Sequence, residues 1–237
     1  MKLQLQYEFT CKCAKCLRIN ENSTLNRIDQ YLEAFQCPQE SCQGTFLWVK
    51  EPSGEIKELQ CQQCEFSSSD VIGEYLDAEH EIKRLVETIW VDQGSASTLR
   101  DVKRKIEEAE SKLAKYFHSY NSYNFQVKMA RAKCHKYVAA LSNTGQGSST
   151  EEIQRQTKNL EELLASLAAV NRFCLLIYPK YHPQRAHILL DMGNVCSVLD
   201  RAEEGKKFIS KGLEILKVCR GSAIAKDQLR QLFSSGH

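Results

Sequence analysis

From residue 71 onward, hydrophobic residues recur every three or four positions, which is the period of an amphipathic helix. The first two stripes, on either side of a Gly94-Ser95 break, comprise Ile82, Leu85, Val86, Ile89 and Trp90, then Leu99, Val102, Ile106, Ala109 and Leu113. A third helix is predicted over 125–141, with Val127, Ala130, Cys134, Tyr137 and Val138. A fourth follows the polar loop 142–150, begins at Thr150 and ends before Pro179, with Leu160, Leu163, Leu164, Leu167, Cys174 and Leu175. These patterns predict antiparallel helices packed in series.

The final part of the chain matches a helical repeat. Counting a repeat of about 34 residues from Ala186 places large apolar residues and small residues as in tetratricopeptide repeats. The positions concerned are Leu189, Met192, Gly193 and Cys196 on one helix, and Gly205, Ile209 and Gly212 on the next. Small residues let two helices cross closely, and the earlier helices would then supply divergent repeats. The alternative interpretation is an ordinary helical hairpin whose glycines coincide with the repeat by chance.

Before residue 70 the pattern is different, with short extended stretches between cysteines. Residues 44–49 read as a strand, 52–54 as a turn and 56–60 as the returning strand. This hairpin lies between two cysteine pairs, Cys37-x4-Cys42 and Cys61-x2-Cys64. Two chelating pairs joined by a hairpin are typical of a zinc ribbon, in which four thiolates hold a structural zinc ion. The alternative is a set of free, buried thiols.

Composition narrows the classes of function. Thirty-two Lys and Arg residues against 30 Asp and Glu residues leave a net charge of +2, which argues against binding nucleic acid through phosphate neutralisation. No apolar run approaches the roughly 18 residues of a membrane-spanning helix. The first six residues are too polar for a signal-peptide core. We therefore expect a protein of the nucleus, the cytoplasm or both, where eleven cysteines favour metal binding over disulfides.

A second cysteine cluster lies near the N-terminus, with three cysteines at Cys11, Cys13 and Cys16. Three thiolates leave a tetrahedral zinc ion one ligand short. His80 and Cys134 are candidate fourth ligands within the chain, and spacing selects neither. The incomplete set also suggests that the fourth ligand comes from outside this chain.

The segment around this cluster resembles a known family. Tyr7-x-Phe9-x-Cys11-x-Cys13-x2-Cys16 looks like the post-SET segment of the SET-and-MYND protein-lysine methyltransferases. The Cys-rich insert and the all-helical remainder are similar to divergent members of the same family. Two links between helices also resemble the family's, at His118-Ser119-Tyr120-Asn121 and at residues 178–183, although Ser119 stands where proline is usual.

The resemblance implies roles for the N-terminal residues. By carry-over, Cys11, Cys13 and Cys16 bind zinc together with a cysteine of the SET domain. Tyr7 lines the channel for the substrate lysine, and Phe9 packs near S-adenosylmethionine. An equally plain interpretation is that Tyr7 and Phe9 are strand residues covering the zinc site. The sequence contains no Asn-His-x-Cys segment, MYND finger or Gly-rich cofactor loop, so S-adenosylmethionine is expected only beside a complete SET domain.

Together these observations predict a mainly α protein in three segments. Residues 1–24 form a post-SET-like Cys segment, 25–70 a zinc-ribbon-like insert, and 71–237 a tetratricopeptide-like antiparallel helical array. The predicted function is the C-terminal portion of a SET-and-MYND lysine methyltransferase, without catalytic residues of its own. Its expected partner is a protein or peptide in the helical groove, with histone as one candidate. The alternative is a stand-alone interaction module with a structural zinc; a redox role for Cys61-x2-Cys64 lacks a thioredoxin-like setting.

Overall fold

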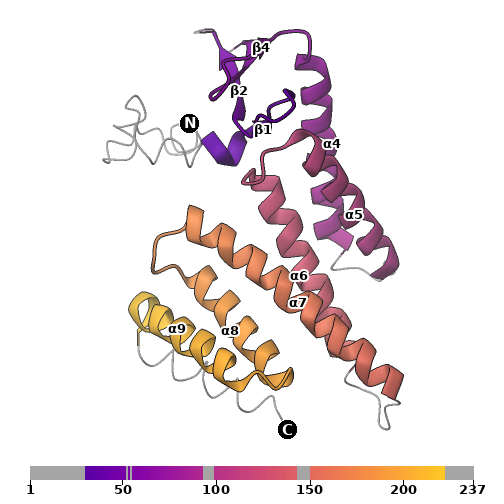
Figure 1. Ribbon diagram of the computed structural model, residues 1–237, viewed down its shortest axis with the longest axis vertical. Coiled ribbons are helices and arrows are strands. Elements are labelled where there is room, and N and C mark those ends of the chain that lie inside the picture. The colour runs from indigo at the N-terminus through magenta and orange to yellow at the C-terminus, as the bar shows by residue number, and fades with distance from the viewer. Residues whose placement is uncertain (1–29, 52, 54, 93–98, 143–149, 222–237) are drawn as a thin grey trace. The chain divides into compact units, whose positions relative to one another are not determined.

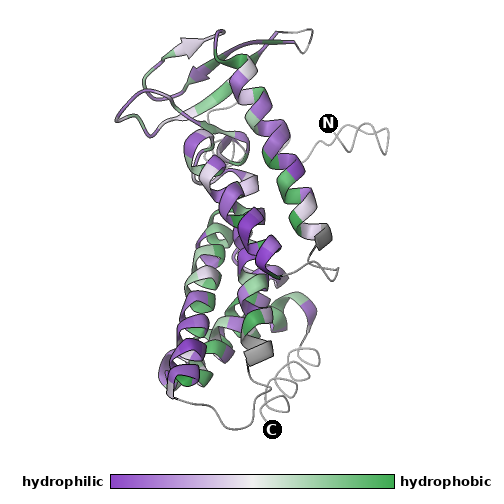
Figure 2. Cartoon of the chain, turned by 90° about the vertical axis from the view of Figure 1, so that its right-hand side faces the viewer, coloured by the Kyte–Doolittle hydropathy of each residue, from purple (hydrophilic) through white to green (hydrophobic). Residues whose placement is uncertain are grey.

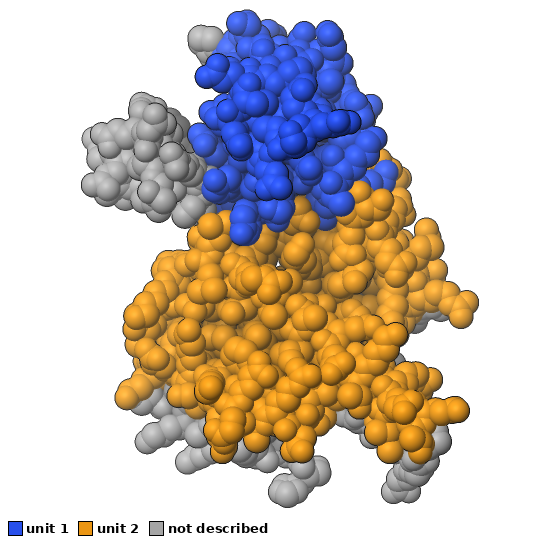
Figure 3. Space-filling model, in the orientation of Figure 1, with its two compact units in different colours: residues 1–80, 112–122 blue, residues 81–111, 123–237 orange. Residues whose placement is uncertain are grey.

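The computed structural model describes residues 30–51, 53, 55–92, 99–142 and 150–221. This part of the chain is mainly helical and carries a small antiparallel sheet. It divides into two compact units, residues 1–80 with 112–122 and residues 81–111 with 123–237 (Figure 3). The predicted post-SET residues Tyr7, Phe9, Cys11, Cys13 and Cys16 lie outside the described residues.

The first unit contains a four-stranded sheet in the order β1-β2-β3-β4, antiparallel throughout (Figure 1). Its strands are β1 (Phe35–Gln36), β2 (Thr45–Lys50), β3 (Ile56–Cys61) and β4 (Ser67–Ser68). The predicted hairpin over 44–60 is confirmed, with Phe46 opposite Cys61 and Trp48 opposite Leu59. The two-residue outer strands were not predicted, because each is too short to show an alternating pattern.

An aromatic cluster forms the core of this unit. The ring of Phe35 lies 5.1 Å from Trp48, 5.2 Å from Tyr75 and 5.1 Å from Phe117, and Tyr75 also meets Phe46 at 5.5 Å. Phe35 also pairs with Phe117 through an isolated antiparallel bridge. Because the rings come from the sheet, from α4 (Ile72–Asp92) and from the residue after α5 (Leu99–Tyr116), the cluster joins segments distant in sequence.

The segment after Phe117 is held to the sheet side of the unit by a buried asparagine. Asn121 is 3% exposed, and its side-chain Nδ2 donates to the backbone oxygen of Ala34 at 3.0 Å. The backbone amide of His118 donates to the same oxygen. Both bonds cross between distant parts of the chain, so Asn121 fixes the link between α5 and α6 (Ser122–Ser142).

Replacing Asn121 with alanine is expected to destabilise the first unit by about 1–3 kcal/mol, because a buried hydrogen-bonding group loses its partner. The free energy of unfolding in urea, followed by the fluorescence of Trp48 in a Trp90→Phe background, measures the effect. Gln36→Ala is the matched control, since that side chain is exposed. Equal stabilities of the two variants would contradict the role assigned to Asn121.

The helices after α6 are α7 (Thr150–Ile177), α8 (Pro183–Val198) and α9 (Ala202–Arg220). Figure 2 shows hydrophilic and hydrophobic residues alternating along the helices. The predicted stripes are largely buried, including Ile82 and Ile89 on α4 and Val102 and Leu113 on α5. None of the described helices combines the length and apolar character needed to cross a membrane.

Two residues of the predicted stripes are not in the core. Tyr137 is 59% exposed and Leu175 is 54% exposed, so their assignment to buried faces was wrong. On α7 the buried face instead runs through Leu163, Leu167, Val170 and Cys174. These four are spaced by four, three and four residues, and Leu175 is one position beyond the last of them. One residue turns the side chain by about 100°, which carries it off that face.

Helices α8 and α9 form a closely packed hairpin (Figure 1). A Cβ atom added to Gly205 would lie 2.9 Å from the backbone oxygen of Gly193. A Cβ atom added to Gly193 would lie 2.4 Å from Cγ1 of Ile209, and one on Gly212 would lie 3.0 Å from Leu190. The three glycines therefore occupy the places where the two helix backbones approach each other. Beneath them, Leu189, Cys196 and Leu216 join the main hydrophobic core of the second unit.

Candidate metal centre

Two short cysteine segments meet at one end of the sheet. Cys37 follows β1 and precedes the turn that contains Cys42, whereas Cys61 is the last residue of β3 and Cys64 lies in the turn before β4. The antiparallel pairing of β1 with β2 and of β2 with β3 brings these turns to the same place, with Phe46 paired to both Phe35 and Cys61. The hairpin therefore brings the two cysteine pairs together, as the sequence spacing predicts.

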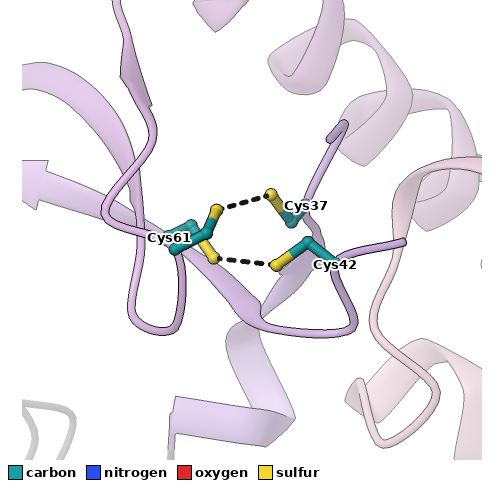
Figure 4. A group of neighbouring side chains, drawn as sticks. Cys37, Cys42 and Cys61 are labelled. Atoms are coloured by element: carbon teal, nitrogen blue, oxygen red, sulfur yellow. Dashed lines mark hydrogen bonds between the residues drawn. The ribbon is translucent and has the colours of Figure 1, made fainter. Parts of the chain in front are cut away.

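The four sulfur atoms of Cys37, Cys42, Cys61 and Cys64 all lie within 4.8 Å of one another. The Sγ atoms of Cys37 and Cys64 are 3.7 Å apart, as are those of Cys42 and Cys61 (Figure 4). Both distances are far longer than the roughly 2.05 Å of a disulfide bond, and all four cysteines are free. Four convergent thiols at this separation form a set of ligands that a single metal ion can bind.

The backbone around each turn is shaped for this convergence. Ser41 and Glu65 adopt left-handed conformations, with φ of 69° and 58°, next to Cys42 and Cys64 respectively. Gly44 leaves space for the sulfurs, because a Cβ atom there would lie 2.7 Å from Sγ of Cys61. Sequence reasoning did not single out these three residues; a glycine two positions after Cys42 was the one available signal.

Backbone amides also point at the sulfurs. The amide of Gly44 donates to Sγ of Cys42, and that of Gln63 donates to Sγ of Cys61, each at 3.4 Å. Burial raises the pKa of Cys61, but the hydrogen bonds from the amides of Cys64 and Gln63 outweigh burial and lower it to about 7. Burial instead raises the pKa of Cys37. The Cys61 thiol thus loses its proton more easily than the Cys37 thiol, and a metal ion binding all four sulfurs would displace the remaining protons.

Four cysteines can supply all the ligands of a tetrahedral metal ion at this place. Cys37 and Cys61 are buried, Cys42 is half-buried and Cys64 is exposed at the surface of the unit. With four protein sulfurs around one ion, a tetrahedral metal keeps no position for water or substrate. The chemistry available to such a site is the cross-linking of the two turns. Among the residues that the structure describes, this is the one group of Cys, His, Asp and Glu side chains found suitable for a metal.

The structure gives the two internal candidates for a fourth post-SET ligand different surroundings. His80 is exposed on α4, and Cys134 is buried on α6. Cys11, Cys13 and Cys16 lie outside the described residues, so a ligand for that cluster stays a prediction. Cys174 and Cys196 are buried in the helical core, and Cys219 packs against it.

Comparison with known proteins adds no assignment: no family model matches the chain, and no curated protein matches it.

Proposed function

We propose that the four-cysteine cluster holds a structural zinc ion. A tetrahedral zinc ion with bonds of about 2.3 Å to sulfur places its ligands about 3.8 Å apart. The Cys37–Cys64 and Cys42–Cys61 separations of 3.7 Å are close to this value. Zinc is also the ion that four-thiolate sites with a hairpin between two pairs usually bind. In this role the ion stabilises the sheet and takes no part in catalysis.

We further propose that the helices form a tetratricopeptide-like module that binds a protein or peptide. The close approach of α8 and α9 at Gly193, Gly205 and Gly212 supports this proposal best, because these residues occupy the small positions of the repeat. Arrays of such repeats present extended surfaces to their partners. The order of α7, α8 and α9, in which each packs on the next, is consistent with the same architecture.

The motif from Tyr7 to Cys16 resembles the post-SET segment of a larger enzyme. We propose that the chain is the C-terminal portion of a SET-and-MYND type protein-lysine methyltransferase, acting in the nucleus, the cytoplasm or both. In that setting Cys11, Cys13 and Cys16 share a second zinc ion with the SET domain, and Tyr7 and Phe9 complete the sites for lysine and S-adenosylmethionine. A histone is one candidate substrate, which the helical module would help to recruit.

The zinc content of the purified chain tests these proposals. Native mass spectrometry should find one tightly bound zinc ion, which Cys61→Ser removes and Cys11→Ser leaves in place. Two tightly bound ions would mean that the post-SET cysteines find a fourth ligand inside the chain, which favours the stand-alone module. No bound zinc would contradict the structural site.

A methyl-transfer assay tests the catalytic part of the proposal. We expect the chain alone, mixed with radiolabelled S-adenosylmethionine and histones, to transfer no methyl group above the protein-free blank. Transfer by the chain alone would show that it contains a complete active site and would contradict the proposal that catalysis needs the SET domain. Heat-treated chain serves as the control for label carried over without enzymatic transfer.

A further inference from the structure

The second unit contains a polar cavity of about 520 Å³ between α5, α6 and α7. Long charged side chains come mainly from α5 and α6, whereas α7 contributes Glu162 and the small residues Ala165, Ser166 and Ala169. The cavity exists because these small side chains face long ones across the gap. Its volume falls within the range of about 300–1,000 Å³ that is typical of sites for small ligands.

Three nitrogen-bearing side chains of α6 line this cavity, Lys128, Arg131 and His135. Their spacing of three and four residues places them on one face of the helix. Nη2 of Arg131 pairs with Oε2 of Glu110, but its Nε atom is buried and has no hydrogen-bond partner in the described part of the chain. One face of α6 therefore lines the cavity with three nitrogen-bearing side chains.

His135 is the most buried of the three, with 8% of its surface exposed. Its Nδ1 atom is buried and has no hydrogen-bond partner among the described residues. The carboxylate oxygen Oε2 of Glu162 lies 3.6 Å away, which is beyond hydrogen-bond distance. Burial lowers the pKa of His135, so the imidazole is neutral near pH 7, and in the Nδ1–H tautomer it offers one donor.

Lys128 is half-buried on the same face. Its ammonium lies 3.5 Å from Oδ1 of Asn124, and no carboxylate of the described residues forms an ion pair with it. Burial lowers the pKa of Lys128, and the nearby charge of Glu110 only partly offsets this effect. An anion in the cavity would add an ion-pair partner for Lys128, beside Arg131 and His135, each of which keeps one buried nitrogen without a hydrogen-bond partner in the described part of the chain.

We propose that this cavity binds the carboxylate of a peptide, from a chain terminus or an acidic side chain, through Lys128, Arg131 and His135. The other wall residues favour a singly charged, peptide-like ligand over phosphate. Glu107, Glu110 and Glu162 balance the formal charges of Lys103, Lys128 and Arg131, so the wall is neutral when His135 is neutral. A dianion would bring two negative charges into this neutral site, whereas a carboxylate brings one, and the glutamate oxygens can accept peptide N–H groups. This inference does not depend on the zinc site or on the methyltransferase resemblance.

Three small probes test the proposal on the full, zinc-loaded chain. N-acetylglycine carries a terminal carboxylate, N-acetylglycinamide is its neutral counterpart, and N-acetylaspartate α-amide carries a side-chain carboxylate. We expect the acid that binds more tightly to shift the amide NMR signals of α6. Its dissociation constant should be on the order of millimolar, because a ligand with so few atoms gains little binding free energy. The amide should bind at least tenfold more weakly. The acid that binds more tightly shows whether the carboxylate comes from a chain terminus or from an acidic side chain.

Variants locate the binding. Lys128→Met keeps the aliphatic stem and should weaken the binding of the preferred acid at least fivefold. Lys136→Met is the matched control, because Lys136 lies on the same helix but pairs with Asp191 at 2.8 Å and does not line the cavity. If Lys128→Met does not fold, Ser166→Leu fills the cavity from α7 and should abolish binding. Equal binding of acid and amide, equal effects of the two lysine variants, tighter binding of inorganic phosphate, or no binding would each overturn the proposal.

Discussion

Replacing Cys61 with serine is expected to abolish metal binding and unfold the sheet of the first unit. Structural zinc sites in small domains contribute an apparent free energy of about 10–16 kcal/mol, which is comparable to the whole stability of a typical domain. The sheet has little else to replace it, since β1 and β4 contain two residues each. The aromatic cluster around Phe35 should lose its packing at the same time, because Phe46 is paired directly with Cys61.

Trp48 provides a local probe of this effect, since its ring lies 5.1 Å from that of Phe35. In a Trp90→Phe background the fluorescence reports on Trp48 alone. The Cys61→Ser variant should show the emission of a solvent-exposed tryptophan and a zinc content near zero. Cys219→Ser is the matched control, because Cys219 packs against the helical core far along the chain from the cluster. A native Trp48 spectrum in the absence of bound metal would contradict the structural role of the site.

The parts of this site that could be predicted from sequence depend on short-range relations. The spacing of Cys37, Cys42, Cys61 and Cys64 and the hairpin between them lie within 28 residues, 37 to 64, and each step is a local pattern. The bridge between Phe35 and Phe117 could not be predicted, because nothing near either residue indicates a partner so far away in sequence. The crowding around Gly44 could not be predicted either, since it depends on where Cys61 lies in space.

In the helical region, too, the sequence predicted local patterns better than contacts between distant residues. Periodicity identified the buried residues of α4 and α5, including Ile82, Ile89, Val102 and Leu113. It was wrong for Tyr137 and Leu175, because hydrophobic side chains at the edge of a stripe can be left exposed without breaking the pattern. The cavity lined by Lys128, Arg131 and His135 was not predicted either. No local pattern around His135 indicates this cavity, because the small residues that line it belong to α7.

Replacing Gly205 with alanine is expected to destabilise the α8–α9 hairpin by about 1–3 kcal/mol, even though alanine favours helices by about 1 kcal/mol over glycine. The added Cβ atom would meet the backbone oxygen of Gly193 at 2.9 Å, and a backbone atom cannot rotate away. The helices must therefore separate, which weakens the packing of Leu189 and Leu216 beneath them. Urea unfolding followed by circular dichroism at 222 nm measures the loss.

Gly73→Ala is the matched control, because this glycine also lies in a helix but a Cβ atom there would meet nothing within 4 Å. It should leave stability unchanged or raise it by up to about 1 kcal/mol, through helix propensity alone. Gly193→Ala offers a second test, since its Cβ atom would clash with the side chain of Ile209 at 2.4 Å. The double variant Gly193→Ala/Ile209→Ala should cost less than the sum of the two single effects, because the contact with the Ile209 side chain is removed and only the approach to the backbone oxygen of Gly205, at 3.0 Å, remains. Additive losses, or a stabilised Gly205→Ala, would show that the helices do not cross at these glycines and would remove the main support for a tetratricopeptide-like repeat.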